Sequence, residues 1–321
     1  MTGDFGAALR DRFGPDRVKA HAPLHDLTTF RVGGPADWLV EPRSSDETIA
    51  ALELARRHGV PVTILGGGSN VLIADRGVRG LVLRPRGGEV HRIAEDRVRA
   101  DAAVTINGLV RWCISHGAAG LEAWAGTPGT VGGAIFGNAH FGGRLIGDHV
   151  TEVRLVSRDG SVRDVSAGEM AFGYDRSRLQ GSGEILLSAD FIVSPGDPAA
   201  LRRVARESLA YRKRTQPLDT PSAGCIFQNP QPGRDVVPGG IPWSAGALVD
   251  RAGLKGAAIG GARVSPAHAN FIVNDGSATA HDIRALIDRC RADVHEQFGV
   301  TLREEIVYLG DFANHHVHSA D

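Results

Sequence analysis

The spacing of apolar and polar residues changes several times along the chain and predicts a mixture of helices and strands. Ser44 and Glu47 resemble a capping box, and the apolar positions that follow predict an amphipathic helix that ends before Gly59. Apolar runs on both sides of Asp159-Gly160 predict a hairpin, because this dipeptide supplies the positive φ angles of a primed turn. The other expected elements are strands at 61–65, 81–83, 268–273 and 301–309, a hairpin at 90–100, and helices at 107–116, 198–214, 244–252 and 282–298.

Length and charge narrow the class of protein. The chain has 321 residues and a mass of 33.9 kDa, which is enough for two domains. Lys and Arg total 36 against 37 Asp and Glu, and the resulting net charge of -1 disfavours binding to nucleic acid or anionic lipid. The charged N-terminus has no apolar signal region, and no apolar run reaches about 18 residues, so we expect a cytoplasmic protein without membrane spans.

The cysteines do not form a recognisable framework. Cys113, Cys225 and Cys290 are odd in number and widely spaced, which argues against disulfides, and they lack the spacing of a zinc site, so we expect no metal. Cys225 differs from the other two because it follows the small residues "SAG" and precedes a turn. This position favours a thiol that a ligand can reach over one buried in a periodic apolar segment.

Glycine is unusually frequent, with 42 residues, and it is clustered. The stretch "ILGGGSNVLIAD" follows an expected strand, and its bare amides suit a nest for phosphate oxygens, although a plain turn explains them equally well. It has neither a dinucleotide nor a P-loop fingerprint. The segment 125–143, "AGTPGTVGGAIFGNAHFGG", is expected to bring backbone amides close to a flat or anionic ligand, and a crossover between domains is the alternative.

Several segments together resemble one known family. The stretches "TFRVGGPA" at 29–36, "LGGGSN" at 65–70 and "GTPGTVGGA" at 126–134 are similar to the FAD-binding half of UDP-N-acetylenolpyruvoylglucosamine reductases. The stretches "PSAGCIFQNP", "AGALVDRAGLKG", "HANFIVN" and "LREEIVYLG" are similar to the second half, in the same order along the chain. The lack of an additional tyrosine-bearing loop between Tyr174 and Tyr211 resembles the shorter, second type of this family.

The resemblance implies an architecture. It implies an α+β protein with an FAD-binding fold of the vanillyl-alcohol-oxidase (PCMH) type in two subdomains, and a C-terminal α+β substrate-binding domain. The implied boundaries are an N-terminal extension at 1–20, an FAD-binding domain at 21–200 with subdomains of about 21–85 and 86–200, a substrate-binding domain at 201–310, and a disordered tail at 311–321.

The resemblance also implies a reaction. This is the NADPH-dependent reduction of UDP-N-acetylglucosamine enolpyruvate to UDP-N-acetylmuramate by a cytoplasmic monomer, a step of peptidoglycan synthesis on which cell shape and division depend. FAD is the implied cofactor and NADPH the hydride donor. Because flavin N5 passes hydride to the enolpyruvyl methylene carbon, the protein must stabilise an enolate and deliver a proton to carbon.

Two of the implied catalytic residues lie in the C-terminal motifs. Cys225 occupies the slot of the family's serine proton donor, and a thiol is a far stronger acid than an alkyl hydroxyl; a packing role is the alternative. Glu305 matches the second catalytic position. Glu304 is expected to point to the opposite face if this segment is a strand, so only one of the two carboxylates should reach the site.

The third implied catalytic residue is an arginine whose register is shifted. Family members usually show Tyr-Arg-x-Ser, whereas this chain has Asp175 in the arginine slot and Arg176 one position later. We expect Arg176, rather than Arg178, to stabilise the enolate. A one-residue shift changes the face of an extended strand, so this role needs a bulge or a nonextended backbone.

The motifs also imply cofactor and substrate contacts. The implied FAD-binding residues are Arg31, Gly33, Gly34, Gly66, Gly67, Gly68, Ser69, Asn70, Gly126, Thr127, Pro128, Gly129, Thr130, Gly132, Gly133, Ala134 and Asn138. The implied substrate-binding residues are Lys213, Arg214, Gln216, Asn229, Lys255, His268 and Asn270. For His268, a hydrogen bond that holds a loop is an equally good interpretation.

Two other functions fit parts of the pattern. One is a different FAD oxidoreductase of the same fold that acts on a sugar or a hydroxy acid, which the C-terminal motifs disfavour. The other is a noncatalytic protein that binds FAD and a UDP-sugar, which the changes at Cys225 and Asp175 would explain and the retained Glu305 disfavours.

Overall fold

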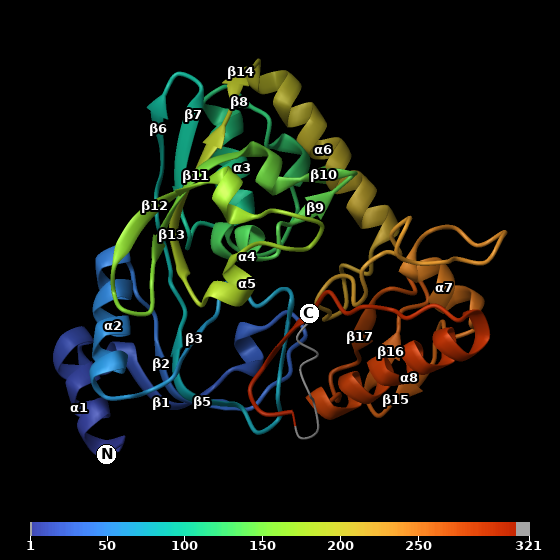
Figure 1. Cartoon of the computed structure of the whole chain (residues 1–321), viewed down its shortest axis with the longest axis horizontal. Coiled ribbons are helices and arrows are strands. Elements are labelled where there is room, and N and C mark those ends of the chain that lie inside the picture. Colours follow the sequence, from blue (N-terminus) through green and yellow to red (C-terminus); the bar gives the residue numbers. More distant parts are fainter. Residues whose placement is uncertain (1, 313–321) are drawn as a thin grey trace. The chain divides into compact units, whose positions relative to one another are not determined.

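A computed structural model describes residues 2–312, with side chains from residue 4 onward, and divides them into two compact units (Figure 1). Unit 1 comprises the residues up to Ala20, Trp38–Ser69 and Leu81–Leu218, and unit 2 comprises His21–Asp37, Asn70–Gly80 and the residues from Asp219 onward. Three of the five boundaries between the units along the chain fall inside strands, namely β1 (Val18–Pro23), β2 (Pro35–Val40) and β5 (Val78–Leu83), and the other two follow Ser69 and Leu218. Each unit has its own apolar core.

The first layer of unit 1 is a four-stranded sheet with two helices. The strand order is β1-β2-β5-β3, where β3 is Val62–Ile64, and the helices are α1 (Thr2–Phe13) and α2 (Ser45–Arg57). The expected start of α2 is confirmed, because the Ser44 hydroxyl accepts a hydrogen bond from the Glu47 amide. The other half of the capping box does not form, since the Glu47 carboxylate instead accepts bonds from the Arg43 amide and from Arg17.

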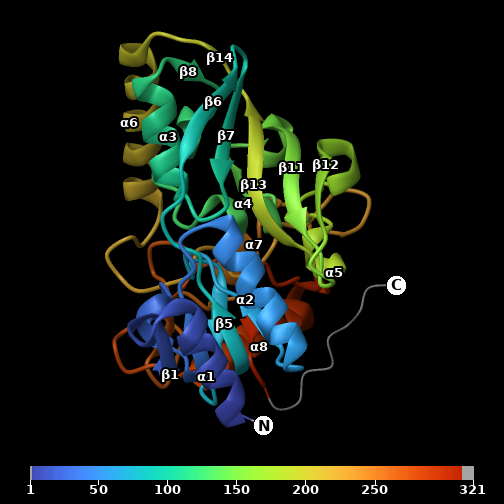
Figure 2. The ribbon, with the colours of Figure 1, turned by 90° about the vertical axis from the view of Figure 1, so that its left-hand side faces the viewer.

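The second layer of unit 1 is a five-stranded antiparallel sheet in the order β12-β11-β13-β7-β6. Its strands are β6 (Val90–Ala94), β7 (Arg97–Asp101), β11 (Val150–Val156), β12 (Val162–Ser166) and β13 (Ile185–Ile192). The helices of this layer are α3 (Ile106–Ser115), α4 (Val131–Phe136), α5 (Leu179–Ser182) and α6 (Pro198–Thr215). Two small two-stranded ribbons complete it, one formed by β9 (His140–Phe141) and β10 (Arg144–Leu145) and the other by β8 (Ala118–Ala119) and β14 (Ser194–Pro195). Figure 2 shows α3 and α6 at one side of the sheet, where they share its apolar core.

Unit 2 combines short strands with two helices. Strand β4 (Val71–Ile73) pairs in parallel with β18 (Val307–Leu309), and β15 (Ala258–Ile259), β16 (Ala262–Val264) and β17 (Ile272–Asn274) form an antiparallel sheet. The helices are α7 (Ala245–Arg251) and α8 (Ala280–Phe298). Helix α8 buries Ile283, Leu286, Ile287, Cys290 and Val294, the three-to-four spacing of one helix face. Each of the aliphatic side chains contributes about 1.5–3 kcal/mol when fully buried.

Several expectations need correction. Of the strand expected at 268–273, only the last residues form β17 (Ile272–Asn274), and of the strand expected at 301–309, only Val307–Leu309 forms β18. The backbone groups of the residues before each strand form hydrogen bonds with other loops instead. Within the hairpin, only Gly160 has a positive φ (91°), so the turn is not of the primed type. The boundary expected at residue 200 falls inside α6, and residues 21–37 and 70–80 group with unit 2.

Residues 313–321 of the expected tail lie outside the described residues. Within residues 2–312, no helix is both long enough and apolar enough to cross a membrane.

Candidate functional site

The two glycine-rich segments of unit 1 lie against each other, backbone to backbone. A Cβ atom at Gly67 would lie 2.5 Å from the Cα atom of Gly129, and one at Gly66 would lie 2.7 Å from Thr130 Oγ1. A Cβ atom at Gly129, where φ is 100°, would lie 2.8 Å from Ser69 Oγ. Side chains are therefore excluded where the loops meet, which explains why both segments need glycine.

The backbone amides show which loop can bind an anionic or flat ligand. In the second loop, the Gly126 amide donates to Asn107, Thr127 to Trp124, and Gly132 to Ala102. Within residues 2–312, the amides of Gly66, Gly67 and Ser69 have no hydrogen-bond partner. The first loop thus offers amide donors of the kind that an FAD diphosphate requires, and the amides of Gly129 and Thr130 in the second loop likewise have no hydrogen-bond partner among the described residues.

The remaining residues of the glycine-rich segment 125–143 are largely structural. The Thr130 hydroxyl caps α4 by accepting from the Gly133 amide, and the Ala134 amide donates to the Thr130 carbonyl. Asn138 is fully buried, and its side chain donates to the Gly173 carbonyl and accepts from the Gly147 amide. The side chain of Asn138 therefore holds two other loops.

Four of the implied FAD residues, Arg31, Gly33, Gly34 and Asn70, belong to unit 2. The Gly34 amide donates to Ala74, and a Cβ atom there would lie 2.1 Å from the Asp75 carbonyl oxygen. The Asn70 side chain donates to the Glu305 carbonyl, and its own carbonyl accepts from the Val307 amide. Both residues therefore shape unit 2, and Asn70 anchors the segment that carries Glu305.

The Cys225 loop is fixed in unit 2 by one asparagine. The buried Asn270 side chain accepts from the Phe227 amide and donates to the Phe227 carbonyl, and the Asn270 carbonyl accepts from the Ile226 amide. Gly224 has a φ of 78°, which a side chain would strain. Cys225 is half-buried, whereas burial raises the pKa of Cys113 and Cys290 to about 12.

The Glu305 segment lies directly beside the cysteine loop. The Glu305 amide donates to the Ile226 carbonyl at 2.8 Å, and the Gln228 amide donates to the Arg303 carbonyl at 2.8 Å. These bonds bring Cys225 and Glu305 onto adjacent segments of unit 2, although they are 80 residues apart in the sequence.

The two neighbouring glutamates have separate environments. Only 15% of the Glu304 side chain is exposed, and its carboxylate pairs with Arg284 at 3.1 Å and Arg291 at 2.9 Å, both on α8. Glu304 is therefore the structural carboxylate. Both glutamates precede β18 (Val307–Leu309), so the alternation expected of a strand does not apply to them, and the role of Glu305 remains a prediction.

The backbone at the shifted arginine is not extended. Gly173 and Arg176 exchange two backbone hydrogen bonds, and Asp175 between them has a φ of 52°. The Arg176 side chain is exposed and has no hydrogen bond or ion pair within the described part of the chain. The turn is the nonextended backbone that a role for Arg176 requires.

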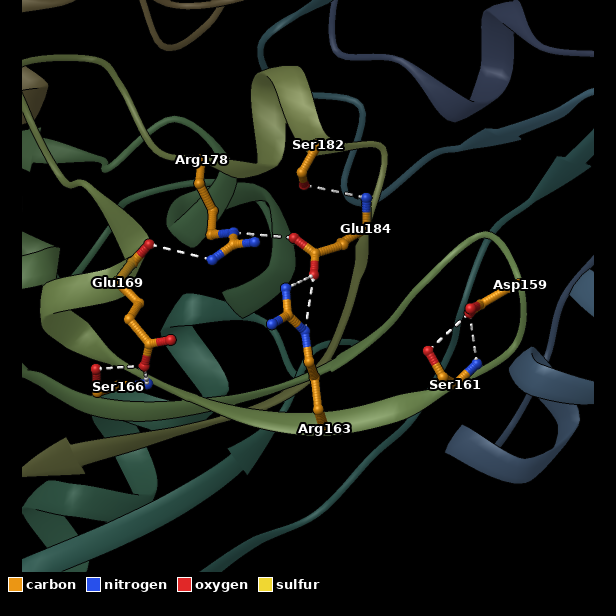
Figure 3. Close-up of polar contacts among 8 residues, drawn as sticks. All are labelled: Asp159, Ser161, Arg163, Ser166, Glu169, Arg178, Ser182 and Glu184. Atoms are coloured by element: carbon orange, nitrogen blue, oxygen red, sulfur yellow. Dashed lines mark hydrogen bonds and ion pairs between the residues drawn. The ribbon is translucent and has the colours of Figure 1, made fainter.

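Arg178 has a structural environment (Figure 3). Its Nε donates to the buried Glu184 carboxylate at 2.9 Å, and its Nη1 donates to the Glu169 carbonyl at 3.3 Å. Arg163 pairs with the same Glu184 carboxylate from β12. Arg178 is therefore a structural residue of this layer, and the role of Arg176 remains a prediction.

All four implied substrate residues in unit 2 have structural partners, and those of Asn270 are given above. Lys255 pairs with Asp250 at 2.8 Å, and the Asn229 side chain accepts from the Ala245 amide at the start of α7. Nδ1 of His268 accepts from the Asn270 amide, and burial lowers the pKa of this histidine. His268 and Asn270 thus form the support of the cysteine loop, which was the alternative interpretation for His268.

The other implied substrate residues end α6 in unit 1. Lys213 and Arg214 are exposed, and Gln216 is the residue at which the helix ends. The Arg214 guanidinium lies 5.6 Å from the centre of the Tyr211 ring. Exposed cations in the last helical turn are suited to an anionic ligand, but they also stabilise the helix itself.

Three polar residues near the glycine loops were not expected from the sequence. Asp175 is buried and accepts a hydrogen bond from His140. Arg212 is buried on α6, donates to the Thr127 hydroxyl at 2.7 Å and lies 3.7 Å from the centre of the Phe141 ring. The only signals were a histidine inside a glycine-rich segment and an arginine among many on a basic helix.

Comparisons with known proteins agree with this geometry. Residues 36–166 match the family described as FAD binding domain, and residues 216–309 match the family described as UDP-N-acetylenolpyruvoylglucosamine reductase, C-terminal domain. A Synechococcus protein named UDP-N-acetylenolpyruvoylglucosamine reductase is 42% identical over 299 residues, which cover 91% of this chain and 93% of that protein. A Symbiobacterium thermophilum protein named UDP-N-acetylenolpyruvoylglucosamine reductase 2 is 42% identical over 298 residues, 92% of this chain and 93% of its own length.

A solved structure is similar over nearly the whole chain. The UDP-N-acetylenolpyruvylglucosamine reductase of Thermus caldophilus has a TM-score of 0.76 and 33% identity, and the match covers 91% of this chain and 99% of that one. The expected α+β architecture with an FAD-binding fold is confirmed.

Proposed function

Because the chain belongs to the UDP-N-acetylenolpyruvoylglucosamine reductase family, we propose that it reduces UDP-N-acetylglucosamine enolpyruvate to UDP-N-acetylmuramate with NADPH as the electron donor. The observation that carries the proposal is the extent of the similarity, which covers 91% of this chain and 93% of a reductase. The enzyme would act as a cytoplasmic monomer in the synthesis of peptidoglycan precursors.

The reaction sets the requirements for the residues. Bound FAD supplies the chemistry by which a hydride reaches the substrate from NADPH. The hydride adds to the methylene carbon of the enolpyruvyl group, and a proton adds to the neighbouring carbon, which bears the carboxylate. Negative charge builds up on that carbon and carboxylate before the proton arrives. The chain must therefore hold the cofactor, stabilise an anion and donate a proton.

Cofactor binding is assigned to the first glycine loop. Its unused amides at Gly66, Gly67 and Ser69 would hold the FAD diphosphate, and the second loop at Gly129 and Thr130 would set their positions. Because the loops meet without side chains, a methyl group at Gly67 would displace one loop from the other.

The proton donor is assigned to Cys225. Its thiol is half-buried on a loop that Asn270 holds at three backbone positions, so it is both reachable and fixed. Fixed geometry favours proton transfer to carbon, which needs a donor at a defined position. A thiol has an ordinary pKa of about 8.5, which makes it a stronger acid than the alkyl hydroxyl expected in this slot.

Glu305 and Arg176 complete the assignment. Glu305 would act on the carboxylate end of the substrate by hydrogen bonding or assist the delivery of the proton. The exposed guanidinium of Arg176 would stabilise the enolate.

The proposal is tested by NADPH oxidation with purified, FAD-loaded protein. Oxidation should accelerate when UDP-N-acetylglucosamine enolpyruvate is added, and UDP-N-acetylglucosamine, which lacks the enolpyruvyl group, should have no effect. Turnover with alcohols or sugars in place of the enolpyruvyl compound would indicate a different oxidoreductase of the same fold. Tight binding of the enolpyruvyl compound without turnover would indicate a noncatalytic binding protein.

A further inference from the structure

A buried carboxylate in unit 1 carries an oxygen without a partner. Asp175 Oδ1 accepts a hydrogen bond from His140 Nδ1 at 2.9 Å, since an ionised carboxylate can only accept. Only 6% of the Asp175 side chain is exposed, and within residues 2–312 its buried Oδ2 has no hydrogen-bond partner. Buried polar atoms are normally hydrogen-bonded, so this carboxylate is an exception that calls for an explanation.

The backbone of Asp175 is unfavourable as well. Its φ of 52° lies in the left-handed region, which is sterically unfavourable for a non-glycine residue. The turn is held by the two bonds between Gly173 and Arg176, and the Asp175 carbonyl accepts from Gln180 Nε2 at 2.9 Å. Two unfavourable features therefore coincide at one residue, and both are fixed by the surrounding structure.

The histidine is presented by a short ribbon at the end of the glycine-rich segment 125–143. Strands β9 and β10 are joined by Gly142 and Gly143, whose φ values of 58° and 78° suit a two-residue primed turn. Neighbouring side chains on a strand point in opposite directions, and Phe141 lies under Arg212 of α6. His140 accordingly points the other way, toward Asp175.

The pair of His140 and Asp175 is connected to the glycine-rich segment 125–143 by a hydrogen bond and by a ring contact. His140 follows Asn138 by two residues, and the Asn138 side chain donates to the carbonyl of Gly173, which begins the turn that carries Asp175. The His140 ring centre also lies 4.9 Å from that of Tyr174, in the same turn. The His140 side chain is 27% exposed, compared with 6% for Asp175.

We propose that His140, positioned by Asp175, donates a hydrogen bond to the enolpyruvyl carboxylate of the substrate, an inference that rests on the proposed function. Asp175 cannot stabilise an anion by itself, because its own negative charge repels the substrate carboxylate. Its bond to Nδ1 fixes the plane of the ring, and the proposed contact to the substrate is made by Nε2. Asp175 is therefore a positioning residue.

The test is a comparison of two ligands by calorimetry on the FAD-loaded protein without NADPH. UDP-N-acetylglucosamine enolpyruvate carries the carboxylate that His140 would contact, and UDP-N-acetylglucosamine lacks it. His140→Ala should weaken binding of the enolpyruvyl compound by about tenfold or more, as expected for loss of a charge-assisted hydrogen bond, and should leave the affinity for UDP-N-acetylglucosamine unchanged. Asp175→Ala should have the same selective effect, and Asp175→Asn, which keeps an acceptor for Nδ1, a smaller one.

A matched control comes from the same unit. His116 is another partly stacked histidine, 4.0 Å from the ring centre of Trp112, and His116→Ala should change neither affinity. If His140→Ala does not fold, His140→Phe keeps the ring and removes both nitrogens, and the same selective loss is expected.

The outcomes separate this inference from the proposed function. An equal loss of affinity for both ligands would show that His140 only supports the fold, and unchanged affinity for the enolpyruvyl compound would show that it makes no contact; either result overturns the inference. Selective loss in a protein whose wild type does not oxidise NADPH would support the contact and refute the reductase activity.

Discussion

Substitutions of the neighbouring residues Glu304 and Glu305 should have different effects, the first on stability and the second on catalysis. Glu304→Gln removes a carboxylate that bonds Arg284 at 3.1 Å and Arg291 at 2.9 Å and is 15% exposed. A bond to a charged group contributes about 1.5–3 kcal/mol, but glutamine still accepts one bond, and Arg284 keeps Asp288 at 2.6 Å. We therefore expect the free energy of unfolding to fall by about 2–3 kcal/mol, which lowers Tm by about 4–10 °C.

Glu305→Gln should behave in the opposite way. We expect kcat/KM for the enolpyruvyl compound to fall by about 10²-fold, as for loss of an acid–base group, while Tm stays within about 2 °C of the wild type. Scanning calorimetry gives Tm, and steady-state NADPH oxidation gives kcat/KM on the same preparations. The reasoning fails if Glu304→Gln abolishes activity at an unchanged Tm, or if Glu305→Gln destabilises the protein as much as Glu304→Gln does.

Three further outcomes follow from the contacts of single side chains. Cys225→Ala should leave the reduction of FAD by NADPH nearly intact and slow the substrate-dependent half-reaction by about 10²-fold or more, and Cys225→Ser should keep much of the activity. Stopped-flow absorbance measures the two half-reactions separately. An equal loss in both would indicate damaged binding instead of a lost proton donor. Arg176→Ala should slow the substrate-dependent half-reaction with little change in Tm. Arg178→Ala breaks the ion pair with the buried Glu184 carboxylate and should lower Tm instead. The assignment would be contradicted if Arg178→Ala slowed the half-reaction and Arg176→Ala lowered Tm. The hydrogen bond from Arg17 lowers the pKa of Glu47 from 4.5 to about 2, so this pair stabilises the fold above about pH 4.5, and its contribution is lost as the pH falls toward 2. In urea titrations, Glu47→Gln should lower the free energy of unfolding by about 1–2 kcal/mol at pH 7 and by almost nothing near pH 2. A difference between the variant and the wild type that does not change with pH would refute this linkage.

Local signals predicted five of the helices but not α1, α4 or α5. The Asp197 carboxylate accepts from two amides at the start of α6, and Ser44 and Ser244 cap α2 and α7 as their positions in the sequence indicate. These caps depend on residues within one turn of the helix, so the sequence contains the information. The strand expected over 301–309 is shorter, because the segment around Glu305 bonds to Ile226, which is distant in sequence.

The candidate site was predictable in its motifs and less so in its roles. Clustered glycines identified both loops, whereas the choice of Glu305 over Glu304 came from the family resemblance, because the segment before β18 is not a strand. That Asn138 and Asn270 hold neighbouring loops depends on contacts 35 and 43 residues away. The contact between His140 and Asp175 also spans 35 residues, and a buried acid in a left-handed turn has no local sequence signature.

The most direct test of the central claim is to identify the product of a reaction that contains the FAD-loaded protein, NADPH and UDP-N-acetylglucosamine enolpyruvate. Mass spectrometry should show UDP-N-acetylmuramate, two hydrogens heavier than the substrate, formed in step with the NADPH consumed. In D₂O, NMR should show solvent-derived deuterium at the carbon that bears the carboxylate, as expected for a proton delivered there by the protein. The assignment of this chain as the reductase would be contradicted if NADPH were consumed without formation of this product. It would also be contradicted if the FAD-loaded protein accepted electrons from NADPH but left the enolpyruvyl compound unchanged.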